Sequence, residues 1–282
     1  MATISSPGIG SGLDVNSIIT QLMAIEQQPL KKLQSAETTI QTQISEVGKI
    51  KSALSKFRDV AAKLASSDFW KQTTGTSSSS AVGVTTSSTA SPAQFDVEVS
   101  SLAKAQAIAA PAVASSSTTL GAGTLSIQRS GGGTAVDVTI EATDTLAGIR
   151  DKINAAGAGV TASILTDASG ARLMMRATAS GTDNAFSTTV SGTGLDGLTF
   201  DAATQTGGAT LAQPAANLAA TVNNLPVSSS SNTLTDVLDG VTLTMSAETV
   251  GPVTINVAAD NDALKKTLND FASAYSDLSK LI

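Results

Sequence analysis

The feature that most constrains this fold is a double row of apolar residues over residues 30–64. The first row recurs at seven-residue spacing: Leu33, Ile40, Val47, Leu54 and Ala61. The second row keeps that period three places later: Ala36, Gln43, Ile50, Phe57 and Leu64. Only Gln43 is polar, and Ile44 beside it can fill the gap. Two such rows form the seam of an α-helix that packs along another helix, either in a coiled coil or in an ordinary bundle. A helix of this length measures roughly 50 Å, so it needs a partner to cover its seam.

A shorter amphipathic helix is predicted before this rod. Asp14 can cap its start with the side-chain carboxylate. Pro29 predicts a break or kink, because proline disfavours the helical conformation of the residue before it. The preceding residues 1–12 are small, polar and rich in glycine, which predicts a flexible N-terminal segment.

Composition limits the chemistry that this chain can perform. Its 282 residues suggest two or three domains, and its net charge of −6 argues against a nucleic-acid partner. It contains no Cys and no His, which excludes disulfides, zinc thiolates and His-dependent catalytic triads. We find neither a secretory signal peptide nor an apolar run of the ~20 residues that a membrane span needs. These rules alone would predict a cytoplasmic protein without membrane insertion.

The middle of the chain predicts β-structure. Residues 72–92 are rich in Ser, Thr and Gly and are interpreted as a linker with one short strand at 81–85, whereas residues 94–102 alternate as a half-buried strand does. Trp70 is expected to pack over the end of the helical layer. Residues 234–238 are expected to form a helical turn. One helix is expected among the strands, capped by Asp144 or Thr145, with Leu146, Ile149 and Ile153 as its apolar face. Further strands are expected at 124–128, 136–140, 160–166, 172–177, 220–222, 227–229, 241–245 and 253–257, the third and fourth forming a hairpin.

The last segment returns to the opening pattern. One row of seven-residue spacing contains Leu264, Phe271 and Leu278, and a second contains Leu268, Tyr275 and Ile282. We therefore predict an α+β multidomain protein with a long, coiled-coil-like helical stem and two β-rich head domains inserted between its helices. The predicted parts are the flexible segment 1–12, the stem 13–70, the inner β domain 77–103 with 217–259, the outer β domain 104–216, and the returning helix 260–282.

Several of these stretches resemble the flagellar filament cap family, the flagellar hook-associated protein 2 family. The stretch 6–30, SPGIGSGLDVNSIITQLMAIEQQPL, resembles its N-terminus, including the Gly-Ser-Gly-Leu-Asp start of the first helix and the Gln-Gln-Pro-Leu break. The stretch 51–64 resembles its stem, and FDVEVSSLAKAQ at 95–106 resembles the strand leading into its head. Residues 228–244 and 260–278 resemble its closing strands and returning helix. Residues 107–217 carry no motif that we recognise.

This resemblance implies a structural protein that works outside the cell. Members of the family form a ring at the distal tip of the growing filament, where they retain exported flagellin and promote its folding and insertion. The implied partners are further copies of the chain, flagellin, the hook–filament junction protein and a flagellar export chaperone. Export through the flagellar type III pathway uses no cleaved signal peptide, so the resemblance replaces the cytoplasmic prediction with an extracellular one.

The resemblance also assigns roles to two sets of apolar residues. The N-terminal set is expected to contact filament subunits: Ile4, Ile9, Leu13, Ile18, Leu22 and Ile25. The second set is expected to pack within the stem: Leu33, Ile40, Val47, Ile50, Leu54, Phe57, Leu64, Leu264, Leu268, Phe271, Tyr275 and Leu278. Family members usually carry a long second half with further stem helices, so this chain is expected to lack a C-terminal part.

Three alternatives belong to other classes of protein. An adhesin that binds host mucus or glycans would use the head domains, and binding of the isolated head to glycans would favour it. A glycosidase would need two carboxylates ~5–10 Å apart, but the acidic residues are scattered. We therefore predict no enzyme, no catalytic residue, no cofactor and no metal. Flagellin and the junction protein are the nearest rivals within the flagellum, and the opening motif and the Gln-Gln-Pro break argue against both.

Overall fold

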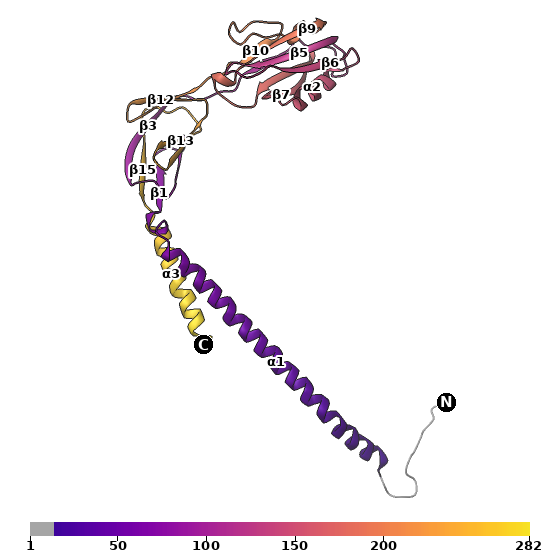
Figure 1. Ribbon diagram of the computed structural model, residues 1–282, viewed down its shortest axis with the longest axis vertical. Helices are drawn as coiled ribbons and strands as arrows, with labels where there is room; N and C mark the ends of the chain where they lie inside the picture. Colours follow the sequence, from indigo (N-terminus) through magenta and orange to yellow (C-terminus); the bar gives the residue numbers. More distant parts are fainter. Residues whose placement is uncertain (1–13) are drawn as a thin grey trace, which may run out of the picture. The chain divides into compact units, whose positions relative to one another are not determined.

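The computed structural model describes residues 14–282, which fall into two compact units. The helical unit comprises residues 14–70 and 261–282, and the β unit comprises Lys71–Asp260. Figure 1 shows the two helices of the first unit and the strands of the second. The predicted α+β class is therefore confirmed. The segment 1–12, predicted to be flexible, lies outside the described residues.

The helical unit begins with α1, which runs without interruption from Val15 to Ala65. Asp14 caps it as predicted, since its Oδ1 accepts the Ser17 N–H at 3.0 Å. The predicted break is wrong, because α1 continues through Pro29. Proline inside a helix removes one hydrogen bond and costs about 3 kcal/mol, but helix propagation adds one bond for every residue fixed. The long run on either side of Pro29 outweighs the single lost bond.

The C-terminal end of α1 differs from the prediction at Trp70. The ring of Phe69 is buried, whereas Trp70 is 53% exposed and its indole N–H donates to the carbonyl of Leu64 at 2.8 Å. The polar tip of Trp70 thus finds a partner on the last turn of the helix, and the apolar ring of Phe69 takes the buried position. The prediction that Trp70 packs over the end of the helical layer is wrong by one residue.

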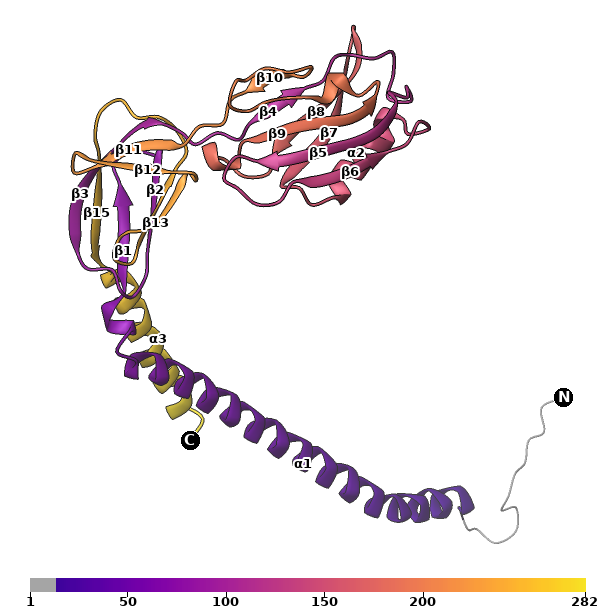
Figure 2. The same cartoon turned by 45° about the horizontal axis from the view of Figure 1, so that its top comes forward.

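The second helix of this unit is α3, Asn261–Ser279. Figures 1 and 2 show it running antiparallel beside the C-terminal part of α1. Phe57 of α1 lies against Phe271 and Tyr275 of α3, with ring centroids 5.1 and 6.1 Å apart. The returning helix therefore contacts only one end of the longer rod, and the rest of α1 has no partner among the described residues.

The β unit contains two hydrophobic cores, and the first is built from two separate stretches of chain. We call it the split lobe (residues 73–103 and 218–259). Its five-stranded antiparallel sheet has the order β1 (Thr73–Ser77), β15 (Val253–Ala259), β3 (Ala93–Ser101), β11 (Leu218–Val222) and β12 (Leu225–Ser229). Its three-stranded sheet has the order β13 (Thr233–Leu238), β14 (Val241–Met245) and β2 (Val82–Thr86). Inward residues of both sheets, among them Val97 and Leu243, share one core.

Two predictions about the split lobe are wrong. Residues 72–92 are not a linker, because β1 pairs with β15 and β2 pairs with β14. The short strand expected at 81–85 is present as β2. Threonine is β-branched and suits a strand. The many small polar residues of this stretch, however, obscure the alternation of apolar and polar side chains by which a strand is recognised in a sequence. Residues 234–238 form strand β13 instead of a helical turn, and its register shifts where Asp236 adopts a φ of 53°. Asp tolerates this left-handed conformation better than most residues.

The second core belongs to the continuous lobe, residues 105–216. One sheet has the order β10 (Thr210–Gln213), β4 (Ala107–Ala109), β8 (Gly170–Ala177) and β7 (Val160–Asp167). The other has the order β6 (Val136–Ile140), β5 (Ala122–Arg129) and β9 (Phe186–Thr193). Helix α2, Leu146–Ala155, buries Leu146, Ile149 and Ile153 in this core, as predicted. The predicted hairpin is β7–β8, closed by the pair Asp167–Gly170.

The start of α2 carries an acid whose ionisation stabilises the fold. Thr145 is the cap, since its Oγ1 accepts the Gly148 N–H at 3.2 Å. Asp144 instead accepts hydrogen bonds from the Lys152 ammonium group and from the Glu141 N–H. These two bonds, that from Lys152 first, lower the pKa of Asp144 below its ordinary value.

Asp144→Asn is expected to destabilise the protein at neutral pH and to matter less in acid. A lowered folded-state pKa means that ionised Asp144 stabilises the fold above the unfolded value of about 3.9. That contribution disappears as the pH falls through the lowered pKa. Urea denaturation of wild type and variant from neutral pH downwards measures the difference. The same change at exposed Asp183 is the control, and a difference that stays constant with pH would contradict this assignment.

Candidate assembly surface

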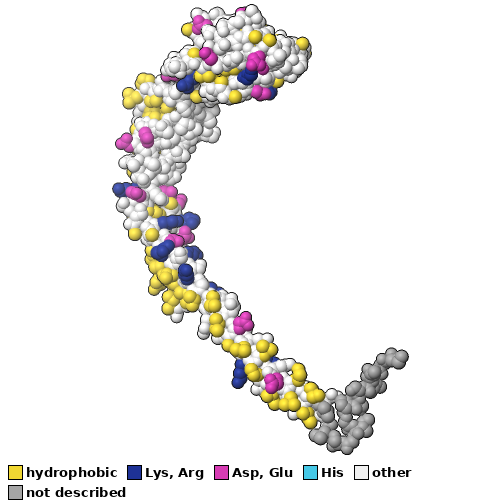
Figure 3. Space-filling view, turned by 45° about the vertical axis from the view of Figure 1, so that its right-hand side comes forward, with side chains coloured by type: hydrophobic (Ala, Val, Ile, Leu, Met, Phe, Trp, Pro, Cys, Tyr) yellow, Lys and Arg dark blue, Asp and Glu magenta, His cyan; other side chains and the backbone are white. Residues whose placement is uncertain are grey.

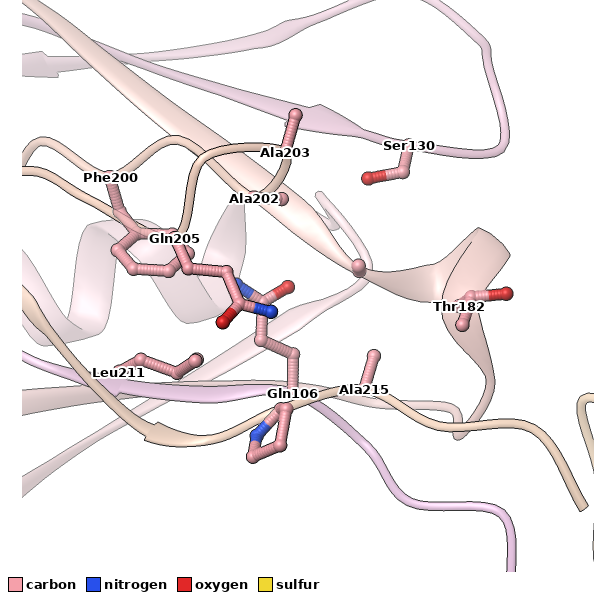
Figure 4. A pocket seen from close by; sticks show the side chains of 11 residues that line it. Gln106, Ser130, Thr182, Phe200, Ala202, Ala203, Gln205, Leu211 and Ala215 are labelled. Atoms are coloured by element: carbon pink, nitrogen blue, oxygen red, sulfur yellow. The ribbon is translucent and has the colours of Figure 1, made fainter.

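Acidic clusters and pockets are the places where a metal ion or a small ligand could bind. Within residues 14–282 no group of three or more acidic side chains is placed to hold a metal ion. The continuous lobe has a pocket of about 310 Å³ whose lining contains Gln106, Phe200, Gln205 and Leu211 but no titratable side chain (Figure 4). Gln106 is buried, and its amide bonds both the N–H and the carbonyl of Phe186, at 2.6 and 3.0 Å. Both polar atoms of the Gln106 amide thus bond the first residue of β9 from the position just before β4.

The most conspicuous surface is an apolar stripe along α1, which we call the α1 stripe. Its members follow one another at steps of three, four or seven residues along one face, and each is between 51% and 69% exposed. They are Leu30, Leu33, Ile40, Ile44, Val47 and Leu54. In Figure 3, yellow side chains gather along this helix. A contiguous exposed apolar surface of this kind is typical of an interaction site.

The structure separates the predicted seam residues into two groups. Ile50, Phe57 and Leu64 are half-buried on the part of α1 that faces α3, whereas Leu33, Ile40, Val47 and Leu54 belong to the exposed α1 stripe. The predicted seam includes Ile44 only as the residue that fills the gap at Gln43, and it does not include Leu30. The row Leu30, Glu37, Ile44 and Lys51 could have identified Leu30, but it alternates apolar with charged residues.

The face of α3 toward α1 is shifted from the prediction. Leu264, Phe271 and Leu278 are half-buried, as one predicted row requires. The companion row is Thr267 and Ala274, and Ala274 is only 1% exposed. Leu268, Tyr275 and Ile282, the predicted companions, are 46%, 60% and 90% exposed. Of these three, Tyr275 still contacts α1, since its ring lies 6.1 Å from that of Phe57. Small Ala274 permits close approach of the two helices, a role that apolar periodicity alone does not reveal.

Phe57→Ala is expected to loosen α3 from α1. Truncating a fully buried Phe costs about 3–5 kcal/mol, so half-buried Phe57 should contribute roughly 2 kcal/mol. A 19-residue helix is marginal on its own in water. Hydrogen exchange of the α3 amides should therefore accelerate. The matched control is Leu33→Ala, which lies far from α3 on the same helix; equal acceleration in both variants would disprove the specific contact.

The N-terminal set of predicted contact residues is only partly described. Ile4, Ile9 and Leu13 lie outside the described residues. Ile18, Leu22 and Ile25 lie on the first turns of α1 and are 42%, 56% and 59% exposed. Their side chains are therefore available to a partner, and their role in filament contact stays a prediction. None of the helices formed by residues 14–282 combines the length and apolar character that membrane crossing requires.

Family models match most of the chain. The flagellar hook-associated protein 2 N-terminus matches residues 11–106, and the C-terminus of the same family matches residues 215–282. The flagellin hook IN motif matches residues 124–179, within the stretch where the sequence suggested no motif. Strands β5 to β8 and helix α2 fall in this last match.

Curated relatives and solved structures agree with these matches. Flagellar hook-associated protein 2 of Escherichia coli K12 is 33% identical over 99% of this chain and 61% of its own length. The B-type protein of Pseudomonas aeruginosa is 33% identical over 100% and 63%. The chain thus spans about three-fifths of these relatives.

The crystal structure of the D1–D2–D3 domains of the E. coli flagellar cap protein FliD matches with a TM-score of 0.76 and 32% identity, covering 84% of this chain and 68% of that one. FliD from P. aeruginosa PAO1 matches with a TM-score of 0.62 and 35% identity, covering 71% and 94%. Sequence and fold agree over most of the chain. The chain belongs to the flagellar hook-associated protein 2 family.

Proposed function

We propose that this chain acts as a structural cap of the bacterial flagellar filament. Several copies would form a ring at the distal tip that retains exported flagellin and promotes its folding and insertion. The observation that carries this proposal is the match of 84% of the chain, with a TM-score of 0.76, to the solved D1–D2–D3 domains of a flagellar cap protein. The relatives reported above are named for the flagellum and not for adhesion, so the adhesin alternative gains no support from them.

The α1 stripe supports an assembly role. Burying one Leu, Ile or Val side chain contributes about 1.5–3 kcal/mol, so six of them supply a strong driving force for docking. We assign the stripe to contacts within the assembled stem, and Ile18, Leu22 and Ile25 to contacts with filament subunits. Ring contacts between copies are assigned mainly to the two lobes. No step of this function requires an enzyme activity.

The domain organisation is part of the proposal. We assign residues 13–70 and 260–282 to a coiled-coil-like stem and both lobes to a head inserted between the stem helices. The inner domain would be 77–103 with 217–259, and the outer domain 104–216. In support, core residues of the continuous lobe all fall between the two stretches that form the split-lobe core.

Partners and location follow from the same assignment. Besides further copies of this chain, the partners would be flagellin, the hook–filament junction protein and a flagellar export chaperone. The place of action would be the filament tip outside the cell, reached through the flagellar type III pathway.

Electron microscopy of filament tips tests the proposal. The chain is expressed in cells that lack their own copy of this protein, with the complete gene restored in parallel. A plate at each tip and filaments of normal length would support capping by these 282 residues. Bare tips and flagellin lost to the medium, both corrected by the complete gene, would place part of the function outside this chain. Bare tips with both genes would refute the cap assignment.

A further inference from the structure

The chain passes between the split lobe and the continuous lobe twice, at Lys104 and at Ala216. We call these two connecting segments the crossings, and they are hydrogen-bonded to each other. The Lys104 N–H donates to the Ala216 carbonyl at 2.8 Å, and the Ala216 N–H donates to the Lys104 carbonyl at 3.0 Å. Two connecting segments alone make a flexible connection, and relative motion is the default for lobes joined in this way. Whether these lobes move therefore depends on further contacts at the crossings.

The split lobe grips the first crossing through one amide side chain. Asn232 lies between β12 and β13 and is half-buried. Its Oδ1 accepts the Ala103 N–H at 2.7 Å, and its Nδ2 donates to the Ala103 carbonyl at 2.9 Å. Both polar atoms of the side chain thus bond the same residue, which fixes the direction in which the chain leaves the lobe.

The continuous lobe reaches back through the turn at residues 180–182, between β8 and β9. The Gly181 N–H donates to the Lys104 carbonyl at 3.2 Å. Ser180 Oγ donates to the Ser230 carbonyl at 2.6 Å, and the Thr182 N–H donates to Asn217 Oδ1 at 2.8 Å. Three successive residues of one lobe therefore bond the crossings or the other lobe.

Gly181 allows this approach. A Cβ at this position would lie 2.4 Å from Ser230 Cβ, 2.6 Å from Ser230 Cα and 3.0 Å from Asn217 Oδ1. These separations are far below a normal van der Waals contact. The φ of Gly181 is +95°, which also favours glycine. The backbone of the turn thus lies directly against Ser230 and Asn217, with no room for a side chain at position 181.

We infer that the turn at 180–182 is a latch that holds the two lobes at a single angle, so that the β unit moves as one body. Without the latch, the bonded crossings at Lys104 and Ala216 become a hinge. Hinges are a few loop residues that absorb large backbone changes, and here the latch removes that freedom by binding both sides. This inference goes beyond the cap function, since it concerns the β unit of any assembly.

Distance measurements between two spin labels test the latch. The chain has no Cys, so Thr74→Cys on β1 and Thr161→Cys on β7, both at exposed positions, give one label on each lobe. We expect one narrow distance distribution. Gly181→Ala in this background should broaden it or add a second population. The matched control is Gly132→Ala, because Gly132 has a φ of +96° but nothing within 4 Å of an added Cβ, and it should leave the distribution unchanged.

A second variant separates the latch from misfolding. Ser180→Ala combined with Asn217→Ala removes the side chains of two latch bonds without adding bulk, and it should broaden the distribution as Gly181→Ala does. Circular dichroism melting confirms that each variant is folded. A broad distribution in the unmutated background overturns the inference. A distance distribution that stays narrow in the folded double variant also overturns the inference, even if Gly181→Ala broadens the distribution.

Discussion

Replacing Ile40 and Val47 together with glutamate is expected to abolish filament capping without unfolding the chain. The two side chains are 56% and 64% exposed, and substitutions at such positions usually change stability by less than about 0.5 kcal/mol. In an assembled stem, however, each carboxylate would be buried in an apolar contact, at a cost of several kcal/mol. Because about 1.4 kcal/mol is a tenfold change in affinity, assembly should weaken by more than about 100-fold.

Tip plates in electron micrographs and flagellin in the culture medium measure this effect. The matched control is Gln41→Glu with Ser45→Glu, which adds the same charge to α1 on a polar face that also carries Thr38 and Lys49. The control should cap filaments as the wild type does. Normal capping by the stripe variant would remove the α1 stripe from the assembly contacts. Loss of capping in both variants would make added charge, and not the stripe, responsible.

Gln106→Leu is expected to destabilise the continuous lobe by about 3 kcal/mol. The substitution leaves the Phe186 N–H and carbonyl without their side-chain partner, and a buried polar group that loses its bond costs about 1–3 kcal/mol. Gln106 is 2% exposed and Phe186 is fully buried, so both partners of the lost bonds lie inside the lobe. This is a large effect against a total stability of about 5–15 kcal/mol.

Hydrogen exchange in rising denaturant should locate the loss. Amides of β4, β8 and β9 are expected to exchange at lower denaturant concentration in Gln106→Leu, while those of the split lobe stay as they are. Gln94→Leu, at an exposed position of β3, is the control and should change neither lobe. Uniform weakening of both lobes would show that they unfold together, and unchanged exchange would show that the buried amide contributes no net stability.

The sequence predicted the helices best where one face carries regular apolar spacing. α2 matches because Leu146, Ile149 and Ile153 are all buried, and α1 matches except that it continues through Pro29. A break at proline is a local preference, and the length of the surrounding helix overrides it. The companion row of α3 was misplaced because burial there depends on the fit of Ala274 against α1, which spacing cannot specify.

Strands were predictable where large residues alternate with polar ones. β3 and the β7–β8 hairpin have that pattern. β1, with the sequence TTGTS, has no large apolar residue. Its place at the sheet edge comes from pairing with β15, in which the partners Thr76 and Asn256 are 180 residues apart in the sequence. The candidate surface on α1 could be predicted only in part, because its exposure also depends on contacts between segments far apart in the sequence. Sequence identified the apolar positions of α1, but only the structure shows where α3 ends and the stripe becomes free.

The bonded crossings at Lys104 and Ala216 have a consequence for how this protein can vary. Because the two ends of the continuous lobe meet within hydrogen-bonding distance, a short turn could replace everything between them with little loop-closure cost. The split lobe keeps its own core and both of its sheets. The continuous lobe could thus be exchanged for a larger or smaller domain inserted between Lys104 and Ala216, while the fold of the split lobe stays unchanged.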